Sequence, residues 1–111
     1  MMNITEITAA LNAEICQNEF DDAELTGAYT SDLLSDVIAN AKDGGALITI
    51  QAHKNTVAVA TLVNISVIII CNSRPLPDDM LEAAKDEGIA VIRTTENQFT
   101  VSGKLWDLLK R

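Results

Sequence analysis

Three short runs of uncharged, mostly aliphatic residues recur along the chain, and they constrain its fold more than any other feature. They occupy residues 46–50 (Ala-Leu-Ile-Thr-Ile), 66–70 (Ser-Val-Ile-Ile-Ile) and 89–92 (Ile-Ala-Val-Ile). The run at 66–70 does not alternate apolar with polar residues, which is typical of a strand covered on both faces in a parallel sheet. Segments with helical spacing separate the runs, so the pattern predicts an α/β fold.

The first half of the chain contains weaker signals. A short helix is expected at 5–12, and a second helix begins after a cap at Thr30 or Ser31 and ends at the Gly-Gly pair. A short candidate strand lies at 24–28, whereas 14–20 could belong to a strand or a helix.

The last two helices carry clearer end signals. Pro77 suits the first turn of a helix that Gly88 ends. Thr95 and Gln98 have the spacing of a capping box at the start of the final helix.

The predicted elements therefore follow one another as one helix and then four strand–helix units. Short connections in such a series specify a parallel sheet with right-handed crossovers. We therefore expect a three-layer α/β/α sandwich with a mainly parallel sheet of four to five strands, formed by residues 1–111 as a single domain. With 48% hydrophobic but only 4% aromatic residues, its core would be aliphatic.

The helix expected at 55–64 is unusual because it carries no charge. It reads Asn-Thr-Val-Ala-Val-Ala-Thr-Leu-Val-Asn. A helix without a polar face must be covered on more than one side. The second cover is either another subunit, which would make the protein a homodimer, or neighbouring elements of the same chain.

The charge balance narrows the range of partners. Sixteen acidic and eight basic residues give a formal net charge of -8, and the basic residues are scattered. Such a protein repels phosphate backbones and anionic lipids, so neither nucleic acid nor a membrane is expected as a partner. The longest apolar stretch, 57–71, is too short to span a bilayer, and residues 1–8 lack a signal pattern, which predicts a cytoplasmic location.

Polar loops follow all four predicted strands. Ligands of open parallel sheets bind beyond the carboxyl ends of the strands, where helix N-termini add donor groups. Three of the loops carry a cation (Lys54, Arg74 and Arg93) although the whole chain is acidic, which favours a small anion or a nucleotide-like ligand. The candidate ligand-binding residues are Thr30, Ser31, Asp32, His53, Asn55, Asn72, Ser73, Arg74 and Thr95.

Two further readings of these loops stay open. Polar residues there are also expected simply as helix caps and as groups that contact water. His53 could alternatively serve as the base for a Cys71 nucleophile, although a buried, inert cysteine is the usual case at the end of an apolar strand.

Other catalytic and metal-binding patterns are missing from the sequence. It contains no Gly-x-x-x-x-Gly-Lys phosphate loop, no Gly-x-Gly-x-x-Gly turn and no Gly-x-Ser-x-Gly elbow. Two cysteines, Cys16 and Cys71, and a single histidine provide no zinc-ligand spacing. We therefore expect a protein without enzymatic activity, metal or cofactor.

Several segments resemble the DRTGG domain family, in particular small stand-alone members that are similar to the N-terminal domain of HPr kinase. The likeness extends over about residues 4–109. It is carried by residues 27–37, 48–55, 57–60 and 68–70, and by Pro77, Ala83, Ala84, Glu87, Gly88, Ile89, Thr94 and Thr95.

The resemblance implies an α/β/α fold and a non-catalytic domain that accompanies regulatory or catalytic modules. A related domain of Mur ligases holds a uridine nucleotide, and stand-alone members accompany iron-hydrogenase and redox-sensor genes. This implies a regulatory role, accessory to a redox or hydrogenase system, with a partner protein from a neighbouring gene. A structural adaptor without a small-molecule ligand is the alternative.

Two features limit what the resemblance carries over. The kinase activity of HPr kinase belongs to a separate domain with a phosphate loop, which this sequence lacks. Where many family members have Thr-Gly-Gly after the central strand, this chain has Cys71-Asn72-Ser73. Glycines at that point would allow a ligand to approach the backbone closely.

Overall fold

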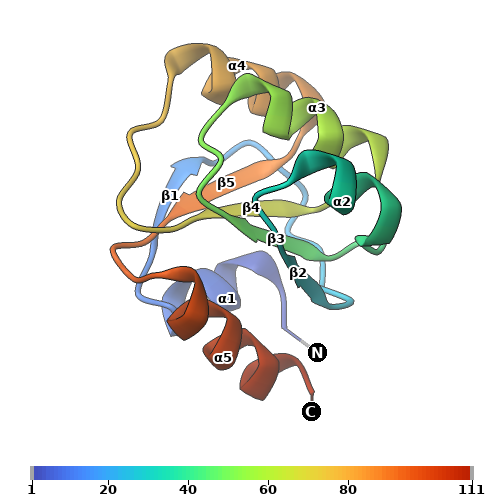
Figure 1. Ribbon diagram of the computed structural model, residues 1–111. Helices are drawn as coiled ribbons and strands as arrows, with labels where there is room; N and C mark the ends of the chain where they lie inside the picture. Colours follow the sequence, from blue (N-terminus) through green and yellow to red (C-terminus); the bar gives the residue numbers. More distant parts are fainter. Residues whose placement is uncertain (1, 111) are drawn as a thin grey trace.

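Five strands form one sheet in the computed structural model, which describes residues 2–110 (Figure 1). The strands are β1 (Glu14–Gln17), β2 (Ala28–Thr30), β3 (Ala46–Thr49), β4 (Val67–Ile70) and β5 (Ala90–Arg93). The helices are α1 (Ile4–Ala10), α2 (Leu34–Asn40), α3 (Lys54–Leu62), α4 (Asp78–Glu87) and α5 (Gln98–Leu109). The order across the sheet is β1-β5-β4-β3-β2; β2 to β5 are parallel, and β1 is antiparallel to β5.

Helices cover both faces of this sheet. α1 and α5 lie on one face, and α2, α3 and α4 lie on the other (Figure 1). Each helix layer packs on the sheet through its own cluster of buried aliphatic side chains. The predicted α/β fold, a three-layer α/β/α sandwich with a mainly parallel sheet, is confirmed.

The central strand β4 shows why its sequence does not alternate. Val67 and Ile69 belong to the core under α1 and α5, whereas Ile68 and Ile70 belong to the core under α2, α3 and α4. All four side chains are fully buried. Burying one such side chain contributes about 1.5–3 kcal/mol. The strand therefore stabilises both helix layers at once.

The edge strand β2 lies further along the chain than predicted. The prediction of a strand at 24–28 is wrong, because β2 begins only at Ala28 and includes Tyr29 and Thr30. Leu25 is instead buried beneath α1, and its amide donates a hydrogen bond to the Met2 carbonyl oxygen. The segment is thus anchored to the α1 layer before it enters the sheet.

The opposite edge of the sheet comes from the segment whose structure the sequence left open. Residues 14–20 contain β1, which pairs with β5. The buried Gln17 side chain donates to the Ile89 carbonyl oxygen at 2.8 Å. This hydrogen bond to the start of β5 explains how a polar residue is accommodated inside the strand pair.

The helix α2 is shorter than the sequence suggests. Its N-cap is Leu33, so the prediction that Thr30 or Ser31 caps it is wrong. The helix ends at Asn40, because the next residue is already extended. Gly44 therefore does not end a helix; its left-handed φ of 79° lets the loop turn into β3.

The ends of α4 and α5 give one confirmation and two corrections. Gly88 ends α4 with a left-handed φ of 67°, as predicted, whereas Pro77 is the extended N-cap, one residue before the first turn in which it was expected. The prediction that Thr95 and Gln98 form a capping box is wrong, because Asn97 caps α5 instead. Its side-chain oxygen accepts an amide of the first turn at 3.0 Å, a role for which asparagine is strongly preferred.

The uncharged helix predicted at 55–64 corresponds to α3, which lies between α2 and α4 (Figure 1). Thr56, Val57 and Ala60 are buried, while Leu62 is 69% exposed. Lys54, Asn55, Ala58 and Thr61 are exposed as well, so α3 keeps one side that neighbouring elements of this chain do not cover. A homodimer through α3 stays a prediction.

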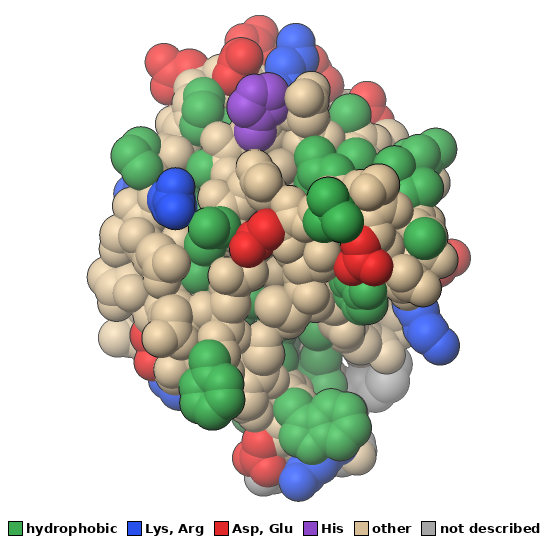
Figure 2. Space-filling model, in the orientation of Figure 1, with side chains coloured by type: hydrophobic (Ala, Val, Ile, Leu, Met, Phe, Trp, Pro, Cys, Tyr) green, Lys and Arg blue, Asp and Glu red, His purple; other side chains and the backbone are tan. Residues whose placement is uncertain are grey.

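Negative charge gathers on α4. Five of its ten residues are acidic, namely Asp78, Asp79, Glu82, Asp86 and Glu87. Acidic side chains are correspondingly frequent at the top of the face in Figure 2, where Figure 1 places this helix. The excess of acidic residues is thus unevenly distributed over the surface.

Replacing Ile69 with alanine tests the double-sided core. The cavity left in the central strand should lower the free energy of unfolding by about 2–5 kcal/mol. Ile38 of α2 is 46% exposed, and Ile38→Ala should cost less than about 1.5 kcal/mol. Urea unfolding of both variants measures the difference, and equal losses would contradict the packing described.

Candidate functional site

The carboxyl ends of β2, β3, β4 and β5 meet at one edge of the sheet because these strands are parallel. We call this region the strand-end edge; it comprises residues 30–33, 50–55, 71–74 and 94–98. All nine residues predicted for the site lie in it. Their contacts divide them into separate groups.

Asp32 is the centre of the first group. Its Oδ1 accepts hydrogen bonds from Thr49 Oγ1, the Ile50 amide and Gln98 Nε2, each at 2.9 Å. Hydrogen bonds to a charged group typically contribute about 1.5–3 kcal/mol. This half-buried carboxylate therefore ties the loop after β2 to β3 and to the first turn of α5.

Gln51 extends the group around Asp32. Its side chain donates to the Asp32 carbonyl oxygen at 3.0 Å, and its amide donates to Thr49 Oγ1 at 3.1 Å. Sequence reasoning missed Thr49, Gln51 and Gln98. Thr49 carried a signal, since it is the polar residue of an otherwise apolar strand; the two glutamines resemble any other loop or helix residue.

His53 and Asn55 form the second group. His53 is the N-cap of α3, and its Nδ1 accepts the Asn55 amide at 3.0 Å. An accepting Nδ1 places the proton of the neutral, exposed imidazole on Nε2. Both residues thus take part in helix capping, which was the alternative to ligand binding.

The loop after β4 contains two consecutive residues in the left-handed conformation. Asn72 has a φ of 61° and Ser73 a φ of 51°, which costs about 1–2 kcal/mol for residues other than glycine. Their amides donate to the Glu96 and Thr94 carbonyl oxygens at 2.9 Å. In the DRTGG domain family, which this chain resembles, the Gly-Gly pair corresponds to these two positions. The positive φ values explain why glycine would suit them.

A hollow of about 280 Å³ lies beside this loop. Ser73, Thr95 and Arg93 contribute to its lining, as do Glu14 and residues of the α1–β1 turn. The Arg93 guanidinium is already paired, because its Nη2 and Nε lie 2.7 and 2.8 Å from Glu14 Oε1, and this contact raises the pKa of Arg93.

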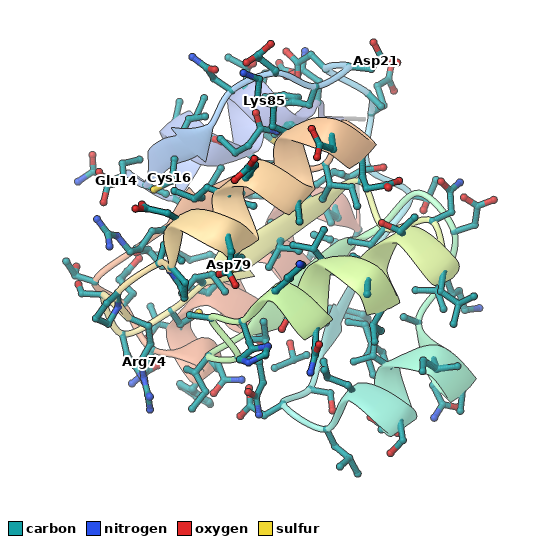
Figure 3. All side chains as sticks on the ribbon, turned by 90° about the horizontal axis from the view of Figure 1, so that it is seen from above. Glu14, Cys16, Asp21, Arg74, Asp79 and Lys85 are labelled. Atoms are coloured by element: carbon teal, nitrogen blue, oxygen red, sulfur yellow. The ribbon has the colours of Figure 1, made fainter. Side chains whose placement is uncertain are left out.

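Arg74 follows Ser73, which lines the hollow, and it is a cation that remains available. Its side chain extends outward from the loop (Figure 3). The ion pairs found among residues 2–110 do not include Arg74. Its guanidinium can therefore meet an anion without first breaking an ion pair.

Thr30 and Ser31 lie at the far end of the strand-end edge. The hydroxyl oxygens of Thr30 and Ser102 are 2.7 Å apart, and Ser31 Oγ accepts the Leu33 amide at 3.2 Å. Two strands separate β2 from β5, which corresponds to about 14 Å. The structure thus brings Ser73 and Thr95 together and keeps Thr30 and Ser31 away from them.

The Cys71 thiol is buried at the end of β4. Burial, followed by the negative charges of Asp32 and Glu96, raises the pKa of the Cys71 thiol to about 11. Burial and the nearby Glu14 also raise the pKa of Cys16. A reactive cysteine needs the opposite shift, so these environments disfavour a Cys71 nucleophile.

No protein-family model matches the chain, and no curated protein matches its sequence. Among solved structures, the chain is similar to the CBS and DRTGG domains of the regulatory region of Clostridium perfringens pyrophosphatase, crystallised with the activator diadenosine tetraphosphate. The TM-score is 0.75 and the sequence identity 18%. The match covers 94% of this chain and 46% of the other, so this chain spans less than half the length of that one.

This similarity concerns the fold, and it supports a DRTGG-related architecture for the chain. It agrees with the resemblance found in the sequence. No helix within residues 2–110 is both long enough and apolar enough to cross a membrane.

Replacing Asp32 with alanine tests its structural role. Three donors would lose their charged acceptor, so we expect the free energy of unfolding to fall by about 2–3 kcal/mol. Asp79→Ala is the matched control, because Asp79 is exposed in the first turn of α4 and should contribute at most about 1 kcal/mol. Urea unfolding compares the two, and similar losses would refute the role assigned to Asp32.

Thiol labelling tests the burial of Cys71. In a Cys16→Ser variant Cys71 is the single thiol. Because it is buried and its pKa is raised to about 11, we expect negligible reaction with an aromatic disulfide reagent at neutral pH. The same variant should react rapidly in urea. Rapid labelling of the folded protein would mean that Cys71 is accessible and ionised.

Proposed function

We propose that this chain is a non-catalytic regulatory domain of the DRTGG type, which binds a small anionic or nucleotide-like ligand at the strand-end edge. The observation that carries this proposal is the fold that the chain shares with a regulatory region crystallised with diadenosine tetraphosphate. The resemblance of residues 27–37 and 48–55 to DRTGG domains points in the same direction.

The part of the edge best suited to the ligand is the hollow beside Ser73 and Thr95. Its volume of about 280 Å³ is close to the lower end of ligand pockets, about 300–1,000 Å³. That size suits a phosphate group with part of a nucleoside. Ser73 and Thr95 offer hydroxyl groups, Asn72 offers an amide, and Arg74 offers a positive charge that forms no ion pair within residues 2–110.

The other five predicted residues have structural roles in the proposal. Asp32 holds β3 and α5 through its carboxylate. His53 and Asn55 cap α3. Thr30 and Ser31 form hydrogen bonds with Ser102 and with the Leu33 amide at the far end of the edge. These residues shape the edge, and the ligand contacts Asn72, Ser73, Arg74 and Thr95.

The proposal includes no chemistry at this edge. A nucleophilic Cys71 would require an accessible thiol of lowered pKa, whereas Cys71 is enclosed and its pKa is raised to about 11. Binding would instead act on a partner protein encoded by a neighbouring gene, in a redox or hydrogenase system of the cytoplasm. Residues 1–111 would act as one domain and as a homodimer.

A structural adaptor without any small-molecule ligand is the second candidate. The internal hydrogen bonds of Thr30, Asp32 and His53 favour it, because they occupy polar groups that a ligand would otherwise contact. The two candidates share a fold and differ in whether the hollow binds an anion.

A thermal-shift screen of nucleotides, dinucleoside polyphosphates and phosphorylated metabolites separates the two candidates. A ligand at 100 times its dissociation constant adds about 2.7 kcal/mol to stability, which raises the melting temperature measurably. We expect at least one member of the panel to do so. If none does, the adaptor function replaces the proposal.

Two variants test whether a ligand that raises the melting temperature binds in the hollow. Arg74→Ala should remove most of the shift, because it deletes the unpaired cation. Lys85→Ala is the matched control, since Lys85 lies on α4 away from Arg74 and contacts Glu19 (Figure 3). A shift that survives Arg74→Ala unchanged, or that Lys85→Ala abolishes, would place the ligand elsewhere.

A further inference from the structure

The outer edge of β2 presents unpaired backbone groups. Within residues 2–110, β2 pairs with β3 alone. The Gly27 carbonyl oxygen and the Ser31 amide both bond β3. Because backbone groups of a strand alternate between its two sides, the amides and carbonyls of Ala28 and Thr30 point away from the sheet. Such an edge is a template for another strand.

A stripe of residues on α5 runs beside this edge. Phe99, Ser102, Trp106 and Leu109 follow one another at helical spacing. Phe99 is 88% exposed and Trp106 is 73% exposed. The contact between Thr30 and Ser102 holds β2 against the stripe. Large hydrophobic side chains stand out at the bottom of the face in Figure 2, where Figure 1 places α5.

A groove of about 390 Å³ lies between β2 and the stripe. Its walls include Ala28, Thr30 and Leu105, and Trp106 stands at its margin. The groove and the projecting aromatic ring therefore belong to the same face of the molecule. A two-fold symmetric interface needs this arrangement, because each copy must supply both the projecting group and the site that receives it.

The hollows on this face have no carboxylate in their linings, and Lys110 at the groove pairs with Asp107 of α5 at 3.4 Å. The groove has a single charged residue in its lining, Lys110, and a smaller hollow of about 200 Å³ on the α2 side of β2 also has one, Lys42. Neither lining contains a carboxylate, although the chain has a formal net charge of -8. Two copies of so acidic a protein repel each other across most faces, such as α4, and meet most easily here.

We propose that a second copy of this chain docks on the β2–α5 face. The two β2 strands pair antiparallel across a two-fold axis perpendicular to the sheet, which joins both sheets into one. The two α5 helices then lie side by side, and Trp106 of each copy packs against the groove of the other. This inference does not depend on the ligand proposed for the strand-end edge.

The exposed aromatic side chains supply part of the area that a dimer needs. Fully buried aromatic side chains cover roughly 150–250 Å² each. At the observed exposure, Phe99 and Trp106 together would contribute about 300 Å² per copy, against about 800 Å² per partner in a standard interface. The β2 edge, the walls of the groove and Leu109 would have to supply the other roughly 500 Å².

Sedimentation velocity on the full chain and three variants tests the proposal. We expect the wild-type protein to dimerise. Trp106→Ala should raise the dimer dissociation constant at least about 30-fold, as loss of a central aromatic anchor does. Ala28→Glu, at an exposed position on β2, should do the same by introducing a charge, and it replaces the first variant if Trp106→Ala fails to fold.

Leu62→Ala is the matched control, because Leu62 is an exposed large hydrophobic residue on α3, away from the proposed face. Its dimer should dissociate like the wild type. A wild-type protein that stays monomeric at millimolar concentration overturns the proposal. A dimer that Leu62→Ala dissolves, or that both Trp106→Ala and Ala28→Glu leave intact, overturns it as well.

Intrinsic fluorescence gives an independent reading, because Trp106 is the single tryptophan of the chain. We expect its emission to shift to shorter wavelength, and its quenching by iodide to weaken, over the concentration range in which the dimer forms. Unchanged emission across that range would show that the dimer uses another surface.

Discussion

The side chains of β4 are buried on both faces of the sheet, and this double burial determines where the other elements lie. Val67 and Ile69 require α1 and α5 on one side, and Ile68 and Ile70 require the other three helices on the opposite side. Parallel strands in such a position must be joined by crossovers, so their carboxyl ends all reach the same edge. The polar loops that could bind a ligand are gathered there by the hydrophobic core.

Within that edge, hydrogen bonding decides which groups remain available. The Asp32 carboxylate is satisfied by three donors, and the His53 ring is used as a helix cap. The loop after β4 differs, since Asn72 and Ser73 hold a left-handed conformation beside a hollow and Arg74 extends outward from them. Backbone strain of this kind often accompanies functional sites. Asp32 and His53 therefore have structural roles, and the loop after β4 is where we propose that a ligand binds.

The sequence predicted the layers well and the details of the edges poorly. Long apolar strands and the Gly88 signal at the end of α4 follow local rules, and the structure bears them out. The start of β2 depends on the burial of Leu25 beneath α1, and the cap of α5 depends on a choice between Asn97 and Thr95. Asp32 was recognised as a polar strand-end residue, but its partners Thr49 and Gln98 lie on distant elements, and no local pattern connects them. The exposure of Trp106 depends on how α5 packs on the sheet, which no local sequence pattern shows.

The fold relates the chain to a regulatory region crystallised with a dinucleotide, and we propose that the hollow beside Ser73 binds such an anionic ligand. Titrating diadenosine tetraphosphate into isotope-labelled protein, while amide chemical shifts are recorded, tests this proposal most directly. We expect saturable shifts at the amides of Asn72, Ser73, Arg74 and Thr95. An absence of shifts at saturating dinucleotide and inorganic phosphate, or shifts confined to β2 and α5, would contradict it.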